Sequence, residues 1–294
     1  MPVEISVIAP LHNEEKNVYE LYKRVSDAVK KLNCTYEIIL VDDGSKDNTL
    51  FAIEKMAVED SRVKYISFSR NFGQQLAFYA GLEKCSGNRI ILIDGDLQDP
   101  PEIIENLWPK LNEGFDVVYA KRKTRRGESF GKKITAKLFY RILNRITSID
   151  IPVDTGDFRI MTRKVADELL RMNDHTKFLR GQIAWLGFKE TYISFEREKR
   201  KTGSTSFGYT KMLRFAFDGI TGFSNFPLKF ASVSGIIVSL FAFIFIIYVM
   251  LAKLAWGQTI SGWASIMVTV LFLGGIQLLS VGIIGEYISR INDA

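Results

Sequence analysis

The chain of 294 residues is poor in cysteine and histidine, and its C-terminal part is poor in charge. The cysteines, Cys34 and Cys85, are too few and too far apart for a disulfide framework, which fits a reducing compartment. The histidines, His12 and His175, are too few for a histidine-based zinc site. No secretory signal is expected either, because residues 1–10 lack a basic region followed by a long apolar stretch.

Charge is distributed very unevenly along the chain. Beyond residue 229 the charged residues are Lys253, Glu286, Arg290 and Asp293. These cancel, so the whole net charge of +6 belongs to residues 1–229. The uncharged runs 230–252 and 263–284 are each long enough to cross a hydrocarbon core of ~30 Å as a helix. The sequence therefore predicts two C-terminal transmembrane helices and excludes an ordinary soluble enzyme.

Flanking charge predicts the orientation of these helices. Lys211, Arg214 and Lys229 precede the first run, whereas the connecting loop offers only Lys253. The bulk of the chain and both termini are then expected to face the cytoplasm, on a bacterial-type plasma membrane crossed more than once. Small residues in the second run suit close helix–helix contact and predict a homo-oligomer.

The rest of the chain alternates between strand-like and helix-like patterns. Expected strands are 3–9, 36–41, 62–68, 89–93 and 116–120, and expected helices are 14–32, 47–58, 73–84 and 101–112. This alternation predicts an α/β domain with a mainly parallel sheet and helices on both faces. The domain organisation expected is a catalytic domain (1–206), an amphipathic juxtamembrane segment (207–229) and an anchor (230–294).

Polar clusters follow three of the expected strands, where parallel sheets bind ligands. They occupy residues 10–15, 42–45 and 94–99. For Asp42 and Asp43, turn formation and helix capping explain the residues as well as ligand binding does. Asp94 and Asp96 can both point at one hard cation, Mg²⁺ or Mn²⁺, held together with substrate phosphates. The intervening Gly95 allows close approach of a ligand.

Other ligand-binding motifs fail on detail. The spacing of Asp94, Asp96 and Glu105 matches an EF-hand, but Asp99 replaces the glycine that its loop requires. Residues 127–132 have one residue too few between the glycines for a P-loop. No GxGxxG pattern follows the first strand, so a Rossmann dinucleotide site is not expected.

Taken together, five segments resemble one family. They are Pro10/Asn13/Glu14, VDDGS (41–45), GQQLAFYAGL (73–82), DGDLQDPP (94–101) and TGDFRIM (155–161). The set is similar to inverting family 2 glycosyltransferases with a GT-A (Rossmann-like) fold and mixed sheet. It most resembles the polyprenyl-phosphate branch, which includes dolichyl-phosphate mannose synthases and bacterial undecaprenyl-phosphate glucosyl- and aminoarabinosyl-transferases. The resemblance implies transfer of a hexose from a nucleotide sugar, with UDP-glucose or a related UDP-sugar favoured, to polyprenyl phosphate.

The same resemblance implies roles for individual residues. Those lining the nucleotide-sugar site would be Pro10, His12, Glu14, Val41, Asp42, Asp43, Asp94 and Gly95. Asp94 and Asp96 would bind the metal, with Gln98 beside them as a further catalytic residue. Asp157 is the candidate general base, although it could equally orient Arg159 or its loop.

Two basic segments, 121–145 and 197–214, are the candidate acceptor site. A charge run is often only a solvated helix face, but the second segment adjoins the apolar tail, where basic residues attract anionic lipid. By resemblance, the lipid phosphate would be gripped by Arg122, Lys132, Lys133 and Arg200. Ser206 stands where the family often has a lysine, and Lys201 or Lys211 is the candidate substitute. No motif for nucleic-acid binding is present.

Two competing functions remain at this point. A processive polysaccharide synthase shares the GT-A catalytic domain. It would need a Q-x-x-R-W segment, which residues 182–186 lack, and more membrane helices. The other competing function is a non-catalytic membrane adaptor with a transferase-like domain. The intact acidic residues Glu14, Asp94 and Asp96 argue against this function.

Overall fold

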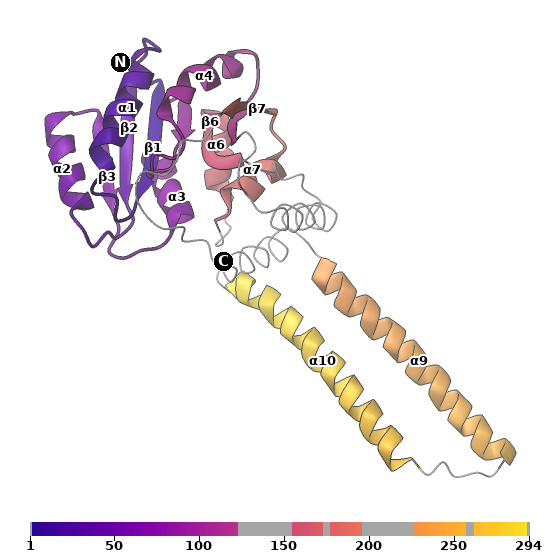
Figure 1. Cartoon of the computed structure of the whole chain (residues 1–294). Helices are drawn as coiled ribbons and strands as arrows, with labels where there is room; N and C mark the ends of the chain where they lie inside the picture. The colour runs from indigo at the N-terminus through magenta and orange to yellow at the C-terminus, as the bar shows by residue number, and fades with distance from the viewer. Residues whose placement is uncertain (1, 123–154, 173–176, 196–225, 257–261, 293–294) are drawn as a thin grey trace. The chain divides into compact units, whose positions relative to one another are not determined.

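The computed structural model describes residues 2–122, 155–172, 177–195, 226–256 and 262–292. The chain divides into two compact units. The first contains the seven strands of the described sheet, and the second contains two long C-terminal helices (Figure 1).

The elements of the first unit follow the expected alternation. In chain order they are β1 (Ile5–Leu11), α1 (Val18–Lys30), β2 (Tyr36–Asp42), α2 (Thr49–Glu59), β3 (Val63–Ser67), α3 (Gln74–Lys84), β4 (Arg89–Leu92), the 3₁₀ helix η1 (Pro101–Ile103), α4 (Ile104–Asn112), β5 (Val117–Arg122), β6 (Thr155–Thr162), α6 (Arg163–Arg171), α7 (Leu179–Leu186) and β7 (Glu190–Phe195). The strands and helices predicted up to residue 120 are all present, with ends that differ by a few residues. The elements of this unit from β6 onward were not predicted.

The strands form one mixed sheet in the order β3-β2-β1-β4-β6-β5-β7. Strands β1 to β4 are mutually parallel, and β6 runs antiparallel to both of its neighbours, β4 and β5. Because of this reversal, β6 begins at the same edge of the sheet at which β1, β2 and β4 end. The residues that open β6 therefore join the strand-end clusters.

Both faces of the sheet are covered by helices, as predicted. Successive strand residues point to opposite faces. Ile38 therefore belongs to the buried cluster that includes residues of α1, α2 and α4, and Ile39 belongs to the cluster that includes residues of α3, α6 and α7. Full burial of each such side chain contributes about 1.5–3 kcal/mol. The two apolar layers hold the sheet rigidly enough to position the loops at its edge.

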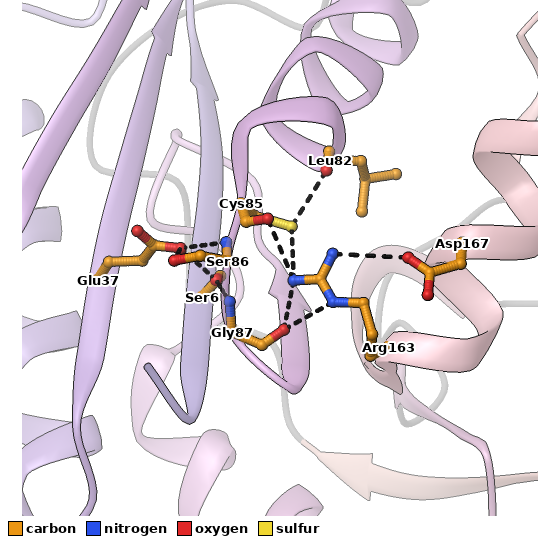
Figure 2. A network of polar contacts seen from close by, with 8 residues as sticks. All are labelled: Ser6, Glu37, Leu82, Cys85, Ser86, Gly87, Arg163 and Asp167. Atoms are coloured by element: carbon orange, nitrogen blue, oxygen red, sulfur yellow. Dashed lines mark hydrogen bonds and ion pairs between the residues drawn. The ribbon is translucent and has the colours of Figure 1, made fainter. Parts of the chain in front are cut away.

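A buried polar network ties the α3–β4 loop to the sheet, at the edge opposite the strand-end clusters (Figure 2). The Oε1 atom of Glu37 accepts hydrogen bonds from the Ser6 hydroxyl (2.6 Å) and from the Ser86 backbone N–H (2.6 Å). Its Oε2 atom forms an ion pair with Lys64 at 2.6 Å. Burial raises the pKa of Glu37, but the hydrogen bonds from Lys64, Ser6 and Ser86 outweigh it and hold that pKa below its ordinary value.

Arg163 fastens the same loop from the other side (Figure 2). Its guanidinium donates to the backbone carbonyls of Gly87 and Cys85, and it lies 3.8 Å from the Asp167 carboxylate. The Cys85 thiol donates to the Leu82 carbonyl (3.2 Å), and burial raises the pKa of that thiol. The loop between α3 and β4 is therefore held by both of its flanks, which fixes where β4 begins.

The second unit contains α9 (Phe226–Trp256) and α10 (Trp263–Asn292), which contact each other. The helices occupy the two apolar runs from which membrane spans were predicted. Within the described parts of the chain, however, no helix has the length and apolar character that crossing a bilayer requires. Helices are thus present at the two predicted positions, but the structure does not support the prediction that they cross a membrane.

Candidate active site at the carboxyl edge of the sheet

The ends of four strands are aligned at one edge of the sheet. Leu11 pairs with Asp42, and Asp42 pairs with Ser67, so β1, β2 and β3 end level with one another. Strand β4 ends at Leu92, which lies opposite Arg159 of β6. The segments that follow β1, β2 and β4 therefore meet the start of β6. This is the position at which open α/β sheets bind ligands.

Asp43 organises the approach to α3. Its buried carboxylate accepts hydrogen bonds from the backbone N–H groups of Phe72 (2.7 Å) and Gly73 (3.0 Å). Gly73 has a φ of +99°, a conformation that favours glycine. The carboxylate thus fixes the turn that leads into the first residues of α3, and its predicted contact with the nucleoside stays a prediction.

The Asp42–Ser45 turn is also held by its own carboxylate. Asp42 is buried and accepts bonds from the Ser45 N–H (3.2 Å) and the Ser67 hydroxyl (3.3 Å). Gly44 has a φ of +63°, and a Cβ there would lie 2.3 Å from the Arg70 carbonyl carbon. The turn interpretation of this segment is therefore correct, and it leaves a role in ligand binding open.

His12 has a defined tautomer. Its Nδ1 lies 2.8 Å from the Asp43 carbonyl oxygen, which can only accept, so Nδ1 carries the proton. Its Nε2 lies 3.0 Å from the Asn13 side-chain nitrogen and accepts from it. The Asn13 amide is oriented by its oxygen, which accepts from the Lys46 N–H at 2.8 Å. Asn13 adopts a left-handed φ of +56°. The chain of hydrogen bonds that runs from Asp43 through His12 and Asn13 to Lys46 joins the loop after β1 to the loop after β2.

The Asp94–Asp96 segment lies against the end of β1. A Cβ on Gly95 would lie 2.6 Å from the Pro10 carbonyl oxygen, so only glycine fits there without displacement. Gln74, the first residue of α3, donates its side-chain amide to Asp94 Oδ1 at 2.5 Å. Asp96 Oδ1 accepts from the Gln98 N–H at 3.1 Å. Both carboxylates are only partly buried, so a ligand can reach them.

The chemistry of this segment fits a divalent cation that is shared with a ligand. Among the described residues, no group of three or more His, Cys, Asp or Glu side chains could enclose a metal. Mg²⁺ commonly takes only one or two protein carboxylates and completes its shell with water and phosphate oxygens. Asp94 and Asp96 supply two such carboxylates, and their role as metal ligands stays a prediction.

Asp157 is the centre of a second cluster. Its Oδ1 accepts from Arg159 Nη2 (3.0 Å) and from Arg180 Nε (3.1 Å), and its Oδ2 accepts from the Gln75 side chain (3.3 Å). The Gln75 oxygen in turn accepts from the Leu179 N–H at 3.2 Å, which ties α3 to α7. Of the two roles considered for Asp157, orientation of Arg159 is the one that these contacts match.

Arg159 is an unusual fully buried cation. Besides Asp157 Oδ1 it donates to the backbone carbonyls of Asp157 (3.0 Å) and Gly156 (3.3 Å), while its Nη1 has no hydrogen-bond partner among the described residues. Burial lowers the pKa of Arg159, and the nearby carboxylates of Asp157 and Asp94 oppose that shift. The Arg159 guanidinium therefore links the Asp157 cluster electrostatically to the Asp94 segment.

The remaining predicted residues do not all lie at the strand-end edge of the sheet. Pro10 and Val41 are strand residues at the edge, and Gln98 is buried beside Asp96. The Glu14 carboxylate accepts from the Asn17 side chain at 2.5 Å. Arg122 ends β5, next to the start of β6. The predicted acceptor residues Lys132, Lys133 and Arg200, together with Ser206, Lys201 and Lys211, lie outside the described residues.

Sequence reasoning missed three contributors to the edge. Gln74 and Gln75 were recognised only as part of a family-like segment, and Arg180 was not singled out. The one available signal was the pair of adjacent glutamines directly after Gly73, at the start of a helix that follows a strand end. Nothing in the sequence indicated that Arg180 contacts Asp157, because α6 lies between Asp157 and α7 in the chain.

The mixed α/β sheet thus carries two partly buried carboxylates, Asp94 and Asp96, at the edge where its parallel strands end. The profile described as "Glycosyl transferase family 2" matches residues 6–170, more than half of the chain. The chain belongs to glycosyl transferase family 2.

Relatives match the chain over nearly its full length. A glycosyltransferase of Bacillus subtilis (strain 168), YkcC, is 46% identical over 99% of this chain and 90% of its own. The "Prophage bactoprenol glucosyl transferase homolog" of Escherichia coli (strain K12) is 39% identical over 98% of this chain and 94% of its own. The "Bactoprenol glucosyl transferase" of Shigella phage SfV is 37% identical, with the same two coverages of 98% and 94%.

Solved structures agree on the fold. The glucosyl-3-phosphoglycerate synthase of Mycobacterium tuberculosis, crystallised with Mn²⁺, UDP and glucosyl-3-phosphoglycerate, superposes with a TM-score of 0.51. It is 18% identical, and the match covers 74% of this chain and 78% of that one. At that identity the likeness establishes the GT-A-like mixed α/β fold alone.

Proposed function

We propose that this protein transfers a hexose from a UDP-sugar, with UDP-glucose favoured, to polyprenyl (undecaprenyl) phosphate with inversion at the anomeric carbon. The observation that carries the proposal is the full-length similarity to relatives named bactoprenol glucosyl transferases, at 37–39% identity. The partly buried Asp94 and Asp96, at the strand edge of a family 2 domain, are the chemical support.

The donor is assigned to the carboxyl edge. Its nucleoside is expected beside Pro10, His12, Glu14 and the Asp42–Asp43 turn, and its diphosphate beside Asp94, Gly95 and Asp96. Asp94 and Asp96 would hold Mg²⁺ or Mn²⁺, which when bound offsets charge on a leaving diphosphate. Gln98, whose N–H bonds to Asp96, helps to set the direction of that carboxylate.

The nucleophile is a phosphate oxygen of the acceptor. A phosphate monoester has a second pKa near ~6, so at neutral pH this oxygen is already mostly anionic. It attacks the anomeric carbon from the face opposite the diphosphate, and the bond to the diphosphate breaks with its electron pair. A general base is therefore less necessary than for a sugar hydroxyl. Asp157, whose oxygens accept bonds from two arginines and Gln75, is proposed to be an orienting group.

The acceptor phosphate is assigned to the basic segments that flank β6 and precede α9. Arg122, Lys132, Lys133 and Arg200 are the proposed contacts, because arginine and lysine are the side chains that bind phosphate. Holding the phosphate in line with the donor supplies orientation, which is a large part of catalysis for bimolecular reactions.

The helices α9 and α10 are proposed to anchor the chain, crossing a bacterial-type plasma membrane with the catalytic unit and both termini on the cytoplasmic side. Support comes from their large apolar side chains, many of which are exposed, including Phe230, Ile236, Phe241, Phe245, Val270 and Ile284. A lipid environment would remove this surface from water. Carbonate extraction of membranes tests the anchor: a chain released into the supernatant would contradict it.

The enzymatic proposal is tested with the purified full-length protein in detergent. UDP- and GDP-sugars, each radiolabelled, are offered with undecaprenyl phosphate and Mg²⁺ or Mn²⁺. We expect one sugar to enter an organic-extractable product that mild acid releases, with Asp96→Ala inactive. A water-soluble polymer would indicate a processive synthase instead. Absence of transfer from every donor would favour the non-catalytic adaptor.

A further inference from the structure

The segment that carries Asp94 and Asp96 continues into an unusual backbone conformation at Leu97. Leu97 has a φ of +56°, in the left-handed region, where the Cβ of an L-residue lies too close to the following carbonyl oxygen. Among the described residues, the other non-glycine residues with a positive φ are Asn13 and Asn33. Asparagine tolerates this conformation because its short polar side chain can hydrogen-bond locally, whereas a bulky apolar side chain cannot. The backbone at Leu97 is therefore strained.

Burial of the side chain explains why Leu97 stays in this conformation. Leu97 is 6% exposed and belongs to the same buried apolar cluster as Leu11 of β1 and Leu107 of α4. A change to an ordinary φ would redirect the Cβ of Leu97 and withdraw its side chain from that cluster. Burial of a leucine side chain stabilises by an amount that is comparable with the cost of one left-handed residue. The apolar core thus imposes the strained turn.

The conformation at Leu97 sets the geometry of Asp96. The Oδ1 atom of Asp96 accepts from the Gln98 N–H at 3.1 Å, so carboxylate and backbone form a closed ring that contains Leu97. Rotation at Leu97 would carry this N–H away from the carboxylate. On the other side of Asp96, a Cβ on Gly95 would lie 2.6 Å from the Pro10 carbonyl oxygen. Asp96 is therefore held between two buried neighbours, although it is itself only partly buried.

Leucine is a costly choice for such a turn. Elsewhere in the chain, positive-φ positions at the same edge are occupied by Gly73 and Asn13, which suit them better. What leucine adds is an anchor in the core. Strained backbone of this kind clusters at functional sites, where it preorganises the groups that meet the ligand. A carboxylate whose direction is set in advance loses less conformational freedom when a metal–phosphate complex binds.

We propose that Leu97 is a positioning residue for Asp96: its buried side chain holds the left-handed turn that directs the Asp96 carboxylate toward the metal ion and diphosphate of the nucleotide sugar. This inference rests on the proposed function and adds to it a residue that acts through Asp96. Because the turn belongs to the free protein, its effect is expected in the binding of UDP with Mn²⁺ as well as in turnover.

The first test detects the left-handed turn through stability alone, in the full-length protein without metal. Thermal denaturation compares alanine and glycine at Leu97 with the same two substitutions at Leu107, a buried leucine inside α4. In a helix glycine is less favourable than alanine, whereas at a left-handed position alanine is strained and glycine is not. We expect Leu97→Gly to melt about 2–4 °C above Leu97→Ala, and Leu107→Gly to melt below Leu107→Ala by a similar interval.

The second test measures the binding of UDP with Mn²⁺ by calorimetry. Loss of a group that orients a metal ligand commonly costs about 10- to 100-fold in metal affinity, and we expect that range for Leu97→Ala. Leu97→Gly permits the turn without holding it, so its affinity should lie between those of Leu97→Ala and wild type. Leu97→Met keeps an apolar anchor of similar volume and should recover most of the affinity. Circular dichroism confirms that each variant is folded.

Leu111→Ala separates positioning from a general loss of packing. It removes a leucine side chain of equal burial, 7% exposed against 6%, from the same cluster near the C-terminal end of α4. We expect this variant to bind UDP with Mn²⁺ within about twofold of wild type, because the two sites are independent.

Three results would each overturn the inference: Leu97→Ala binding as tightly as Leu111→Ala, Leu97→Gly melting below Leu97→Ala, or Leu97→Gly binding no more tightly than Leu97→Ala. Should Leu97→Ala fail to fold, the comparison of Leu97→Gly with Leu97→Met decides, and equal affinities would overturn the anchor. Wild type that binds UDP with Mn²⁺ but transfers no sugar would overturn the proposed function alone. Wild type that does not bind them would overturn both.

Discussion

The side chain of Gln74 donates a hydrogen bond to Asp94 Oδ1 across 2.5 Å, so the first residue of α3 sets the direction of a candidate metal-binding carboxylate. This places a neutral amide behind the carboxylate. Groups in that position orient metal ligands and commonly tune affinity for the ion.

Gln74→Ala should therefore weaken metal use without abolishing the reaction. Removal of an outer-shell partner commonly costs about 10- to 100-fold in metal affinity or activity. We expect the Mn²⁺ concentration for half-maximal transfer to rise within that range, while the rate at saturating metal changes little. Leu76→Ala, a change at an exposed residue of the same helix, is the control. An unchanged metal titration for Gln74→Ala would show that the amide has no such role.

Glu37 makes the catalytic unit sensitive to acid. Because its pKa in the folded protein is below the ordinary value, the unfolded chain binds the proton more tightly. Its contribution to stability is present above the unfolded pKa of about 4.3 and is lost as pH falls through the lower, folded pKa. We expect the melting temperature of wild type to fall below about pH 4 more steeply than that of Glu37→Gln, whose amide does not titrate there.

At neutral pH the same substitution should destabilise the protein. Glu37→Gln replaces an ionised acceptor of bonds from Ser6 and Ser86, and hydrogen bonds to charged groups contribute about 1.5–3 kcal/mol. The Lys64 ion pair adds little, because the Lys64 side chain is 53% exposed. Lys64→Ala is therefore the matched control, and chemical denaturation should find it less destabilising than Glu37→Gln. The opposite order would mean that the ion pair, not the buried hydrogen bonds, holds the loop.

The His12 tautomer can be tested by replacing one ring nitrogen at a time. Asparagine places an amide N–H near the position of Nδ1 and can still donate to the Asp43 carbonyl. Glutamine reaches the position of Nε2 instead and loses that bond. Loss of one neutral hydrogen bond costs about 1 kcal/mol, so His12→Gln should be less stable than His12→Asn by that order. Equal melting temperatures for the two variants would contradict the assigned tautomer.

The sequence was informative where the signal is local. Strand and helix periodicity located β1 to β5 and α1 to α4, and glycine and aspartate at strand ends located the edge site. The antiparallel β6 could not be derived in this way, because its pairing joins Leu92 to Arg159 across a long stretch of chain. The ion pair between Asp157 and Arg180 escaped for the same reason.

The sequence also does not reveal which donor a given carboxylate accepts hydrogen bonds from. Asp43 was assigned to a ligand, but its carboxylate also holds the backbone N–H groups of Phe72 and Gly73. The helix expected from residue 47 begins after Asn48, and the Asp47 carboxylate accepts from the backbone N–H and the hydroxyl of Thr49. Residue type and spacing show that a carboxylate has an acceptor role. They do not show whether the donor belongs to the protein or to a ligand.

Gly95 offers a steric test of the edge site. A Cβ at this position would lie 2.6 Å from both the Pro10 carbonyl oxygen and a Leu11 methyl carbon, so Gly95→Ala must push β1 and the Asp94–Asp96 segment apart. Overpacking of this kind costs about 1–3 kcal/mol, and the displaced carboxylates should lower kcat far more than a surface change does. Gly114→Ala is the matched control, because its Cβ would meet nothing within 4 Å and only its φ of +89° is strained. We expect Gly114→Ala to lose about 1 kcal/mol of stability and to keep normal turnover, while Gly95→Ala loses both. Normal turnover in a folded Gly95→Ala would mean that Asp94 and Asp96 need not lie against β1 for the reaction.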